Sequence, residues 1–362
     1  MAKLYEVKTS SGKGKGVFAT LEIQPGDIVM RDEARMRILD YFNGVSARQI
    51  QEALAILSPV HQAEFLQLSE GIKESTFKFA NIYRANSFGS GASGADAVVC
   101  LKVSRVNHAC IPNSELDMQD EGDCKLFATR EIKKGEEVLI NYCGSGTKAK
   151  RQDLLQSHYG FVCQCVTCSL TGEALELSDA RRNLYNALLQ LINGATREND
   201  MRITSWKAPA DRERVPYNFI AARLLEAEGI SGTIIGVCYE NAAESLLAQI
   251  RDLGLKHIIV LPAIKLLIEF FELSIQWRGT TRQADAERLR LSKGYWAALQ
   301  GTDPHLQKGK KALDSLAALG ITTIPSERFA LICGADGQFL KFVSQDECLA
   351  MVRKERRVTQ SE

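Results

Sequence analysis

The sequence predicts an α+β protein in which a β-rich core of short strands, interrupted by a helical insertion, is followed by an all-helical domain. Residues 1 to about 37 alternate β-branched runs with glycine and proline, as in "GKGVFAT" and "EIQPGDIVMRDEA", which is typical of strands and turns. Beyond residue 171, stretches such as "DARRNLYNALLQLIN" repeat apolar residues three and four positions apart, as amphipathic helices do. A chain of 362 residues, 45% of them hydrophobic, suffices for two or three domains.

The predicted β-rich core is split along the chain. Residues 45–80, which begin "VSARQIQEALAILSPVHQAEFLQL", change to helical spacing and therefore predict the insertion. Strand patterns return in "AVVCLKVSRVN" and in "CKLFATREIKKGEEVLINY", where "KKGEE" predicts a turn between two half-buried strands.

Charge and hydropathy exclude several classes of partner. Lys and Arg total 45 against 44 for Asp and Glu, so the net charge of +1 predicts no direct nucleic-acid binding and no attraction to an anionic membrane. The most apolar segment, "IIVLPAIKLLIEFF", is interrupted by Pro262, Lys265 and Glu269, so we expect no transmembrane helix. The first residues lack the apolar segment of a secretory signal. We therefore expect a nuclear or cytoplasmic protein whose cysteines are free or metal-bound.

The stretch "FVCQCVTCS" contains a metal-binding pattern. Cys163, Cys165 and Cys168 form C-x-C-x-x-C, which suits a tetrahedral Zn²⁺ site that needs one more ligand. Cys110, in the loop "RVNHACIPNS" after a predicted strand, is the best candidate for that ligand by context. His158 lies just upstream of the cluster and competes for the role, so the residues alone leave the fourth ligand open.

Four motifs and the cysteine loop occur in an order that resembles the SET-domain lysine methyltransferases, and more narrowly their SMYD branch. The motifs are "GKGVFAT" (14–20), "NSF" (86–88), "RVNHACIPNS" (105–114) and "GEEVLINY" (135–142). The resemblance implies the following domains: a SET domain (1–160) split by a helical insertion (about 38–85), a post-SET zinc loop (161–170), a helical C-terminal domain (171–335) and a C-terminal segment (336–362). The SMYD branch carries a cysteine-rich MYND module in the insertion, but residues 38–85 contain no cysteine.

The resemblance also implies the site. The residues that it assigns to S-adenosylmethionine are Lys15, Gly16, Asn86, Asn107, His108, Tyr142 and Phe161. Tyr142 matches the catalytic tyrosine of the family, and Tyr159 matches a wall of the lysine channel. The resemblance further implies that Cys110 completes the zinc site with Cys163, Cys165 and Cys168.

The implied function is S-adenosylmethionine-dependent protein-lysine N-methylation, by a monomer, of a histone or another protein. Two alternatives are an interaction scaffold that has lost catalysis and an enzyme that acts on a small-molecule amine, because a fold does not fix its substrate.

Overall fold

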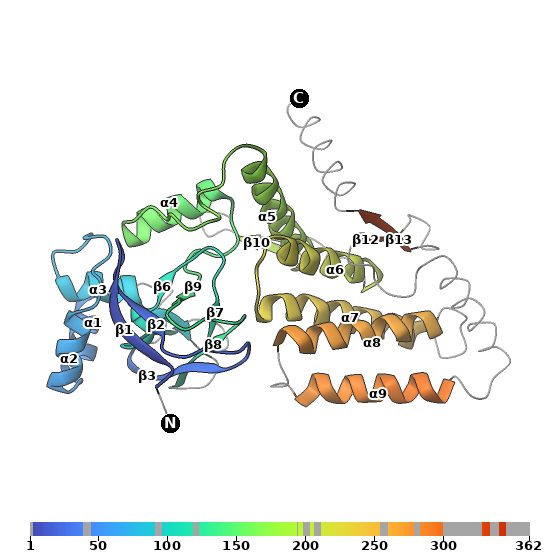
Figure 1. The fold of residues 1–362 in the computed structure, drawn as a ribbon, viewed down its shortest axis with the longest axis horizontal. Helices are drawn as coiled ribbons and strands as arrows, with labels where there is room; N and C mark the ends of the chain where they lie inside the picture. Colours follow the sequence, from blue (N-terminus) through green and yellow to red (C-terminus); the bar gives the residue numbers. More distant parts are fainter. Residues whose placement is uncertain are drawn as a thin grey trace. The chain divides into compact units, whose positions relative to one another are not determined.

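The computed structural model describes residues 3–38, 45–90, 96–118, 123–193, 195–197, 203–205, 211–253, 260–278, 283–299, 328–333 and 340–344 (Figure 1). The chain divides into two compact units, Met1–Leu175 and Glu176–Glu362. The first unit holds most of the strands and the second holds most of the long helices. This arrangement confirms the predicted α+β class, with a β-rich core followed by a helical region.

A small four-stranded sheet of the first unit joins motifs that are far apart in the sequence. Its strands, in the order β1-β2-β9-β6, are Tyr5–Ser10, Gly14–Ala19, Glu137–Ile140 and Asn107–His108. Strand β2 runs antiparallel to β1 and β9, whereas β6 runs parallel to β9 with His108 opposite Ile140. The sheet therefore sets the predicted cofactor segments side by side.

A five-stranded sheet forms the rest of the β core. Its order is β4-β5-β3-β8-β7, with bounds Phe88–Ser90, Asp96–Cys100, Ile28–Ile38, Asp123–Ala128 and Ser114–Asp117. The long strand β3 pairs with β8 along its first half and with β5 along its second half. Val17, Val98, Leu126 and Val138 are fully buried between these elements. Each such side chain contributes about 1.5–3 kcal/mol of transfer free energy.

The predicted insertion is confirmed as helical. It contains α1 (Ala47–Ala55), α2 (Pro59–Leu66) and α3 (Lys78–Asn86). Ser46 and Gln49 form a capping box at the start of α1, and Ser58 caps α2 immediately before a proline, which is a common helix start.

Two buried cysteines depart from the expectation that the thiols are free or metal-bound. Cys100 on β5 and Cys124 on β8 are joined as a disulfide. Both residues flank β3, where Ala34 pairs with Cys100 and Asp32 with Cys124. The strand order thus brings together two cysteines that their sequence contexts did not connect.

A helix and a loop close the first unit. Helix α4 (Lys148–Tyr159) begins at the cap Thr147 and ends at Gly160, whose φ of 76° is left-handed and suits glycine. The cysteine loop follows directly, and α5 (Gly172–Asn193) spans the boundary between the two units.

The second unit is mainly helical but not all-helical as predicted. Its further helices are α6 (Asp211–Ala227), α7 (Thr233–Leu253), α8 (Val260–Arg278) and α9 (Gln283–Leu299). Two short antiparallel pairs correct the prediction: β10 (Ala195–Arg197) with β11 (Ile203–Ser205), and β12 (Arg328–Cys333) with β13 (Leu340–Ser344). Strands β10 and β11 have three residues each, which is too short for an alternating pattern to show in the sequence. The remainder of the predicted C-terminal segment lies outside the described residues.

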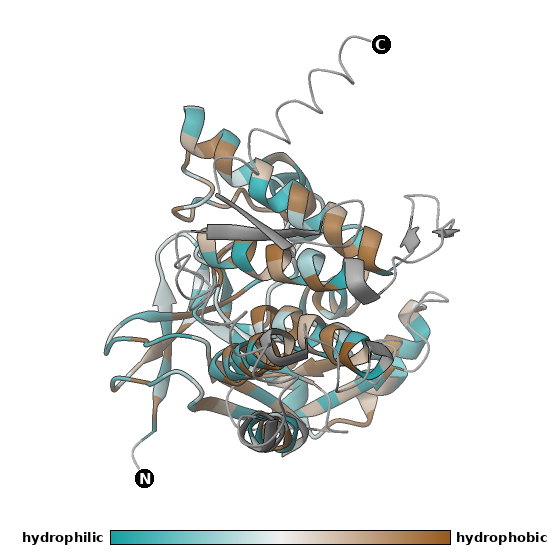
Figure 2. Cartoon of the chain, turned by 90° about the vertical axis from the view of Figure 1, so that its right-hand side faces the viewer, coloured by the Kyte–Doolittle hydropathy of each residue, from teal (hydrophilic) through white to brown (hydrophobic). Residues whose placement is uncertain are grey.

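Phe219, Tyr239, Phe270 and Phe271 lie at the centre of the second unit's own core. Hydrophobic and hydrophilic residues occur on the same helices in Figure 2, as expected of amphipathic helices that bury one face. None of the helices in the described part of the chain has the length and apolarity to cross a membrane.

Candidate functional site

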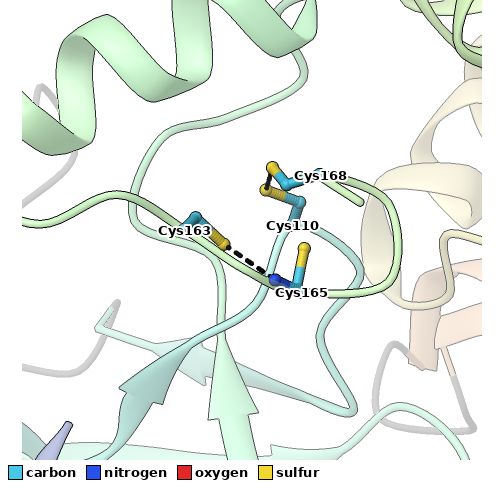
Figure 3. Close-up of side chains that lie close together, drawn as sticks. All are labelled: Cys110, Cys163, Cys165 and Cys168. Carbon is cyan, nitrogen blue, oxygen red and sulfur yellow. Dashed lines mark hydrogen bonds between the residues drawn. The ribbon is translucent and has the colours of Figure 1, made fainter. Parts of the chain in front are cut away.

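Four cysteines converge at one point of the first unit. The sulfur atoms of Cys110, Cys163, Cys165 and Cys168 all lie within 4.8 Å of one another, and Figure 3 shows the two chain segments that bring them together. Cys110 comes from the loop after β6, and the other three come from the loop after α4. His158, the competing ligand, is exposed and its ring lies near Ser157 and Leu154 instead. This all-sulfur donor set could hold a metal ion, and it suits zinc better than magnesium or calcium.

A buried arginine lies against two of these sulfur atoms. The Arg151 side chain is 1% exposed, and its Nε donates to Cys110 Sγ at 3.2 Å. Its Nη2 approaches Cys168 Sγ at 3.7 Å, and its Nη1 donates to the Gly146 carbonyl. Hydrogen bonds within the cluster, that of Cys110 first, and then the Arg151 guanidinium lower the pKa of Cys168 to about 6. These surroundings favour the thiolate form of Cys168, which is the form that metal binding requires, whereas hydrogen bonds with Cys143 and then with the other cysteines raise the pKa of Cys110.

His108 links the cysteine cluster to the end of β9. Its Nδ1 accepts a hydrogen bond from the Tyr142 backbone N–H at 3.0 Å, so the neutral ring carries its proton on Nε2. Nε2 lies 3.3 Å from Cys110 Sγ and 3.8 Å from Cys143 Sγ. The imidazole can thus donate to the Cys110 sulfur, which orients that ligand. In this tautomer His108 and Cys143 do not form a second metal site with Cys110, although the three residues are close together.

Aromatic side chains lie directly beside the cysteines. We call Tyr142, Tyr159, Phe161 and His108 the aromatic cluster. Ring centroids are 4.9 Å apart for Tyr142 and Tyr159, 6.3 Å for Tyr159 and Phe161, and 5.3 Å for His108 and Tyr142. The Tyr142 hydroxyl donates to the Val106 carbonyl. Burial, and then the proximity of Tyr159 and Glu137, raise the pKa of Tyr142 well above its usual value, so its phenol stays protonated.

The start of strand β2 meets β6 and β9. Asn107 Nδ2 donates to the Lys15 carbonyl at 3.1 Å and to Glu137 Oε1 at 2.8 Å. A Cβ at Gly16 would lie 2.4 Å from Glu137 Oε1 and 2.9 Å from Asn107 Nδ2, so a larger residue there would displace both of these side chains. Burial raises the pKa of Glu137, but hydrogen bonds from Asn107, Lys13 and Ser10 outweigh it and hold the pKa below its usual value. Lys15, Gly16 and Asn107 therefore lie together.

Asn86, the remaining predicted cofactor residue, has its side chain engaged elsewhere. It is the last residue of α3, and its amide donates to the carbonyls of Ser69 and Ile82, each at 2.7 Å. Among the described residues, this amide makes no hydrogen bond with Lys15, Gly16 or Asn107. Its place in the cofactor site stays a prediction.

Sequence reasoning missed three polar residues of the site, Glu137, Arg151 and Asn113. Asn113 is fully buried and clamps β9 by accepting from Leu139 N at 2.8 Å and donating to the Glu137 carbonyl at 2.9 Å. Glu137 lies in the motif "GEEVLINY" and Asn113 in the motif "RVNHACIPNS". Their place in these two motifs is the signal that could have identified them as site residues. Arg151 lies in the basic run "KAKRQ", which looks like an ordinary solvated helix face.

Comparison with known proteins supports the same region. The SET domain family model matches residues 14–143. Histone-lysine N-methyltransferase set5 of Schizosaccharomyces pombe is 27% identical over 183 residues, which cover 50% of this chain and 55% of that protein. Histone-lysine N-methyltransferase ATXR4 of Arabidopsis thaliana is 35% identical over 85 residues, 23% of this chain and 25% of that protein.

These similarities cover part of each protein. The chain spans about half the length of the Schizosaccharomyces pombe protein and a smaller share of the Arabidopsis thaliana protein. A solved structure of a Plasmodium falciparum protein aligns with 39% of this chain and 95% of that chain at 20% identity, with a TM-score of 0.22, which is too low to support a statement about the fold.

Proposed function

We propose that this chain, whose residues 14–143 form a SET domain, is an S-adenosylmethionine-dependent protein-lysine N-methyltransferase. One observation carries the proposal: the aromatic cluster and the hydrogen bond from Asn107 to the Lys15 carbonyl both lie beside strand β9, on either side of the Asn107–His108 dipeptide. The similarity to proteins named as histone-lysine methyltransferases supports the same reaction class.

The residues proposed to hold the cofactor are Lys15, Gly16, Asn86, Asn107, His108, Tyr142 and Phe161. When bound, S-adenosylmethionine supplies an electrophilic methyl group on a sulfonium. The bare backbone at Gly16 permits close approach of a ligand, and the Asn107 amide offers hydrogen-bonding groups to its polar atoms.

The aromatic cluster is proposed to receive the substrate lysine. Removing the proton from a lysine amine costs roughly 4 kcal/mol at neutral pH, starting from a reference pKa near 10.4. Half-buried rings of Tyr142, Tyr159 and Phe161 disfavour the ammonium form and so lower that cost. Tyr142, whose phenol keeps its proton, orients the amine and does not act as a base. Tyr159 forms a wall of the channel.

Zinc is proposed at the four-cysteine cluster with a structural role. The donors fit a closed tetrahedral site, and the loop that they fix carries Phe161 and follows Tyr159. The cysteine loop, the helical second unit and the absence of cysteine from residues 38–85 favour an SMYD-like protein without a MYND module.

A protein lysine, in a histone or another nuclear or cytoplasmic protein, is the proposed substrate, and the chain is proposed to act as a monomer without direct contact to nucleic acid or membrane. The histone assignment rests on what the similar proteins are named. A small-molecule amine and a non-catalytic scaffold are the outcomes that the following experiment separates.

The experiment compares wild type with Tyr142→Phe in the transfer of a labelled methyl group from S-adenosylmethionine to histones and to free lysine. We expect transfer to histone by wild type and a loss of about a hundredfold in Tyr142→Phe, because the amine is misplaced. Tyr83→Phe is the matched control, since Tyr83 is fully buried and its hydroxyl bonds the Ala97 carbonyl in another core cluster.

Each result has a distinct meaning. Equal rates for wild type and Tyr142→Phe would remove Tyr142 from its proposed role. Transfer only to the free amine would replace the protein substrate with a small molecule, and no transfer to either acceptor would favour the scaffold.

A further inference from the structure

Glu137 is a half-buried carboxylate that no motif reasoning assigned to the site. It is the first residue of β9, opposite Phe18 of β2, and its side chain is 14% exposed. One carboxylate oxygen accepts from Asn107 Nδ2 at 2.8 Å, and the other pairs with Lys13 Nζ at 2.9 Å. Both oxygens of the Glu137 carboxylate are therefore bound by residues next to Lys15 and Gly16, which are predicted to contact the cofactor.

The hydrogen bonds of Asn107 determine which way its amide points. Both hydrogens of Nδ2 are donated, one to the Lys15 carbonyl and one to Glu137 Oε1. A flipped amide would set Oδ1 against the same two acceptors, which is repulsive. In the described part of the chain no group donates to Asn107 Oδ1, so this oxygen remains an acceptor on a partly exposed side chain.

We propose that Glu137 is a positioning residue: its carboxylate fixes the Asn107 amide so that Oδ1 is presented to an N–H group of the bound cofactor. The inference rests on the proposed function, and it deepens the description of that site. Gly16 makes the arrangement possible, because a Cβ there would occupy the space of both the carboxylate and the amide.

A double-mutant cycle on S-adenosylmethionine binding tests this inference. The dissociation constant is measured by titration calorimetry for wild type, Glu137→Ala, Asn107→Ala and the double variant. Loss of a charge-assisted hydrogen bond predicts a dissociation constant about tenfold higher for Glu137→Ala. In the Asn107→Ala background, the same change should add less than about twofold, because Glu137 acts through Asn107.

Matched variants separate positioning from general loss of structure. Glu136→Gln changes the neighbouring carboxylate, which bonds Arg130, Lys133 N and Asn113, and should leave the dissociation constant within about twofold of wild type. Lys13→Ala removes the ion pair of Glu137 and should also leave the dissociation constant within about twofold of wild type. Glu137→Gln retains an acceptor and should restore most of the affinity, which also covers the case in which Glu137→Ala fails to fold.

The outcomes distinguish this inference from the proposed function. Absence of binding by the zinc-loaded wild type would overturn both. Binding by wild type with additive effects of Glu137→Ala and Asn107→Ala would overturn only the positioning role. If Lys13→Ala lost as much affinity as Glu137→Ala, the effect would belong to the ion pair, and the positioning role would again be overturned.

Discussion

Asn107 and His108 are neighbours that serve opposite sides of the site. Successive side chains of a strand point to opposite faces. On β6 the Asn107 amide reaches Lys15 and Glu137, whereas the His108 ring reaches Cys110 and the backbone of Tyr142. This dipeptide therefore connects Lys15 and Glu137 to the cysteine cluster. A change in the geometry of the cysteine loop would move His108 and, through the backbone, Asn107.

The cysteine cluster predicts a sharp difference between two neighbouring thiols. Cys165 is one of the four clustered cysteines. Cys143 is not one of them, although it contacts Cys110 and His108. Cys165→Ser should lose the bound zinc and weaken S-adenosylmethionine binding, because the loop that carries Phe161 loosens. Cys143→Ser should keep about one zinc per chain, as a closed site of four ligands requires.

Metal content of both purified variants, measured by mass spectrometry, checks this prediction. Circular dichroism of Cys165→Ser should still show the helices of the second unit, which has its own core. Loss of zinc from Cys143→Ser together with its retention in Cys165→Ser would contradict the ligand set.

At the scale of elements, β9 organises the site. It pairs with β2 and β6, it begins with Glu137, and Tyr142 follows its last residue by two positions. Asn113 holds its middle through Leu139 and Glu137. The strand thus fixes Gly16, His108 and the proposed catalytic Tyr142 relative to one another.

The turn before β9 predicts a dependence of stability on pH. Burial raises the pKa of Glu136, but bonds from Arg130, the Lys133 N–H and Asn113 outweigh it and lower the pKa below the reference value of 4.5. A carboxyl with a lowered folded-state pKa contributes stability above its unfolded pKa and loses it as pH falls through the folded value. Wild type should therefore exceed Glu136→Gln in melting temperature near about pH 6, and the gap should close below about pH 4.

The melting temperatures of wild type and Glu136→Gln are compared by thermal unfolding across that pH range. Since protonated Glu136 resembles glutamine, the two curves should converge at low pH. Parallel curves would show that Glu136 has the same pKa in the folded and unfolded chain.

Most elements were predictable because their patterns are long. The strands β2, β3, β5, β8 and β9 and the helices of the insertion and of the second unit follow from turn residues and apolar spacing. The pair β10–β11 was not predictable, because strands of three residues are too short to show an alternating pattern. Cys100 and Cys124 were also missed as partners, since their pairing depends on the strand order around β3.

Only those site residues that belong to a recognised motif could be predicted from the sequence. Cys110, Tyr142, Tyr159 and Phe161 came from the resemblance, and the structure brings them together. Arg151 could not be foreseen, because an arginine in a basic run gives no sign of burial against sulfur. Burial of a charge is decided by what packs over it, which a single sequence does not reveal.

For the whole molecule, the comparisons and the proposed chemistry concern mainly the first unit. The SET match ends at residue 143, and all the predicted site residues lie before Glu176. The second unit has a separate aromatic core around Phe219 and Phe270.

We propose that the chain has a cofactor site held in place by a structural metal. Titration calorimetry of the full chain with S-adenosylmethionine, on protein whose zinc content has been determined, tests it most directly. We expect about one zinc per chain and saturable binding of about one equivalent of S-adenosylmethionine. Zinc-loaded protein that binds no S-adenosylmethionine would contradict it.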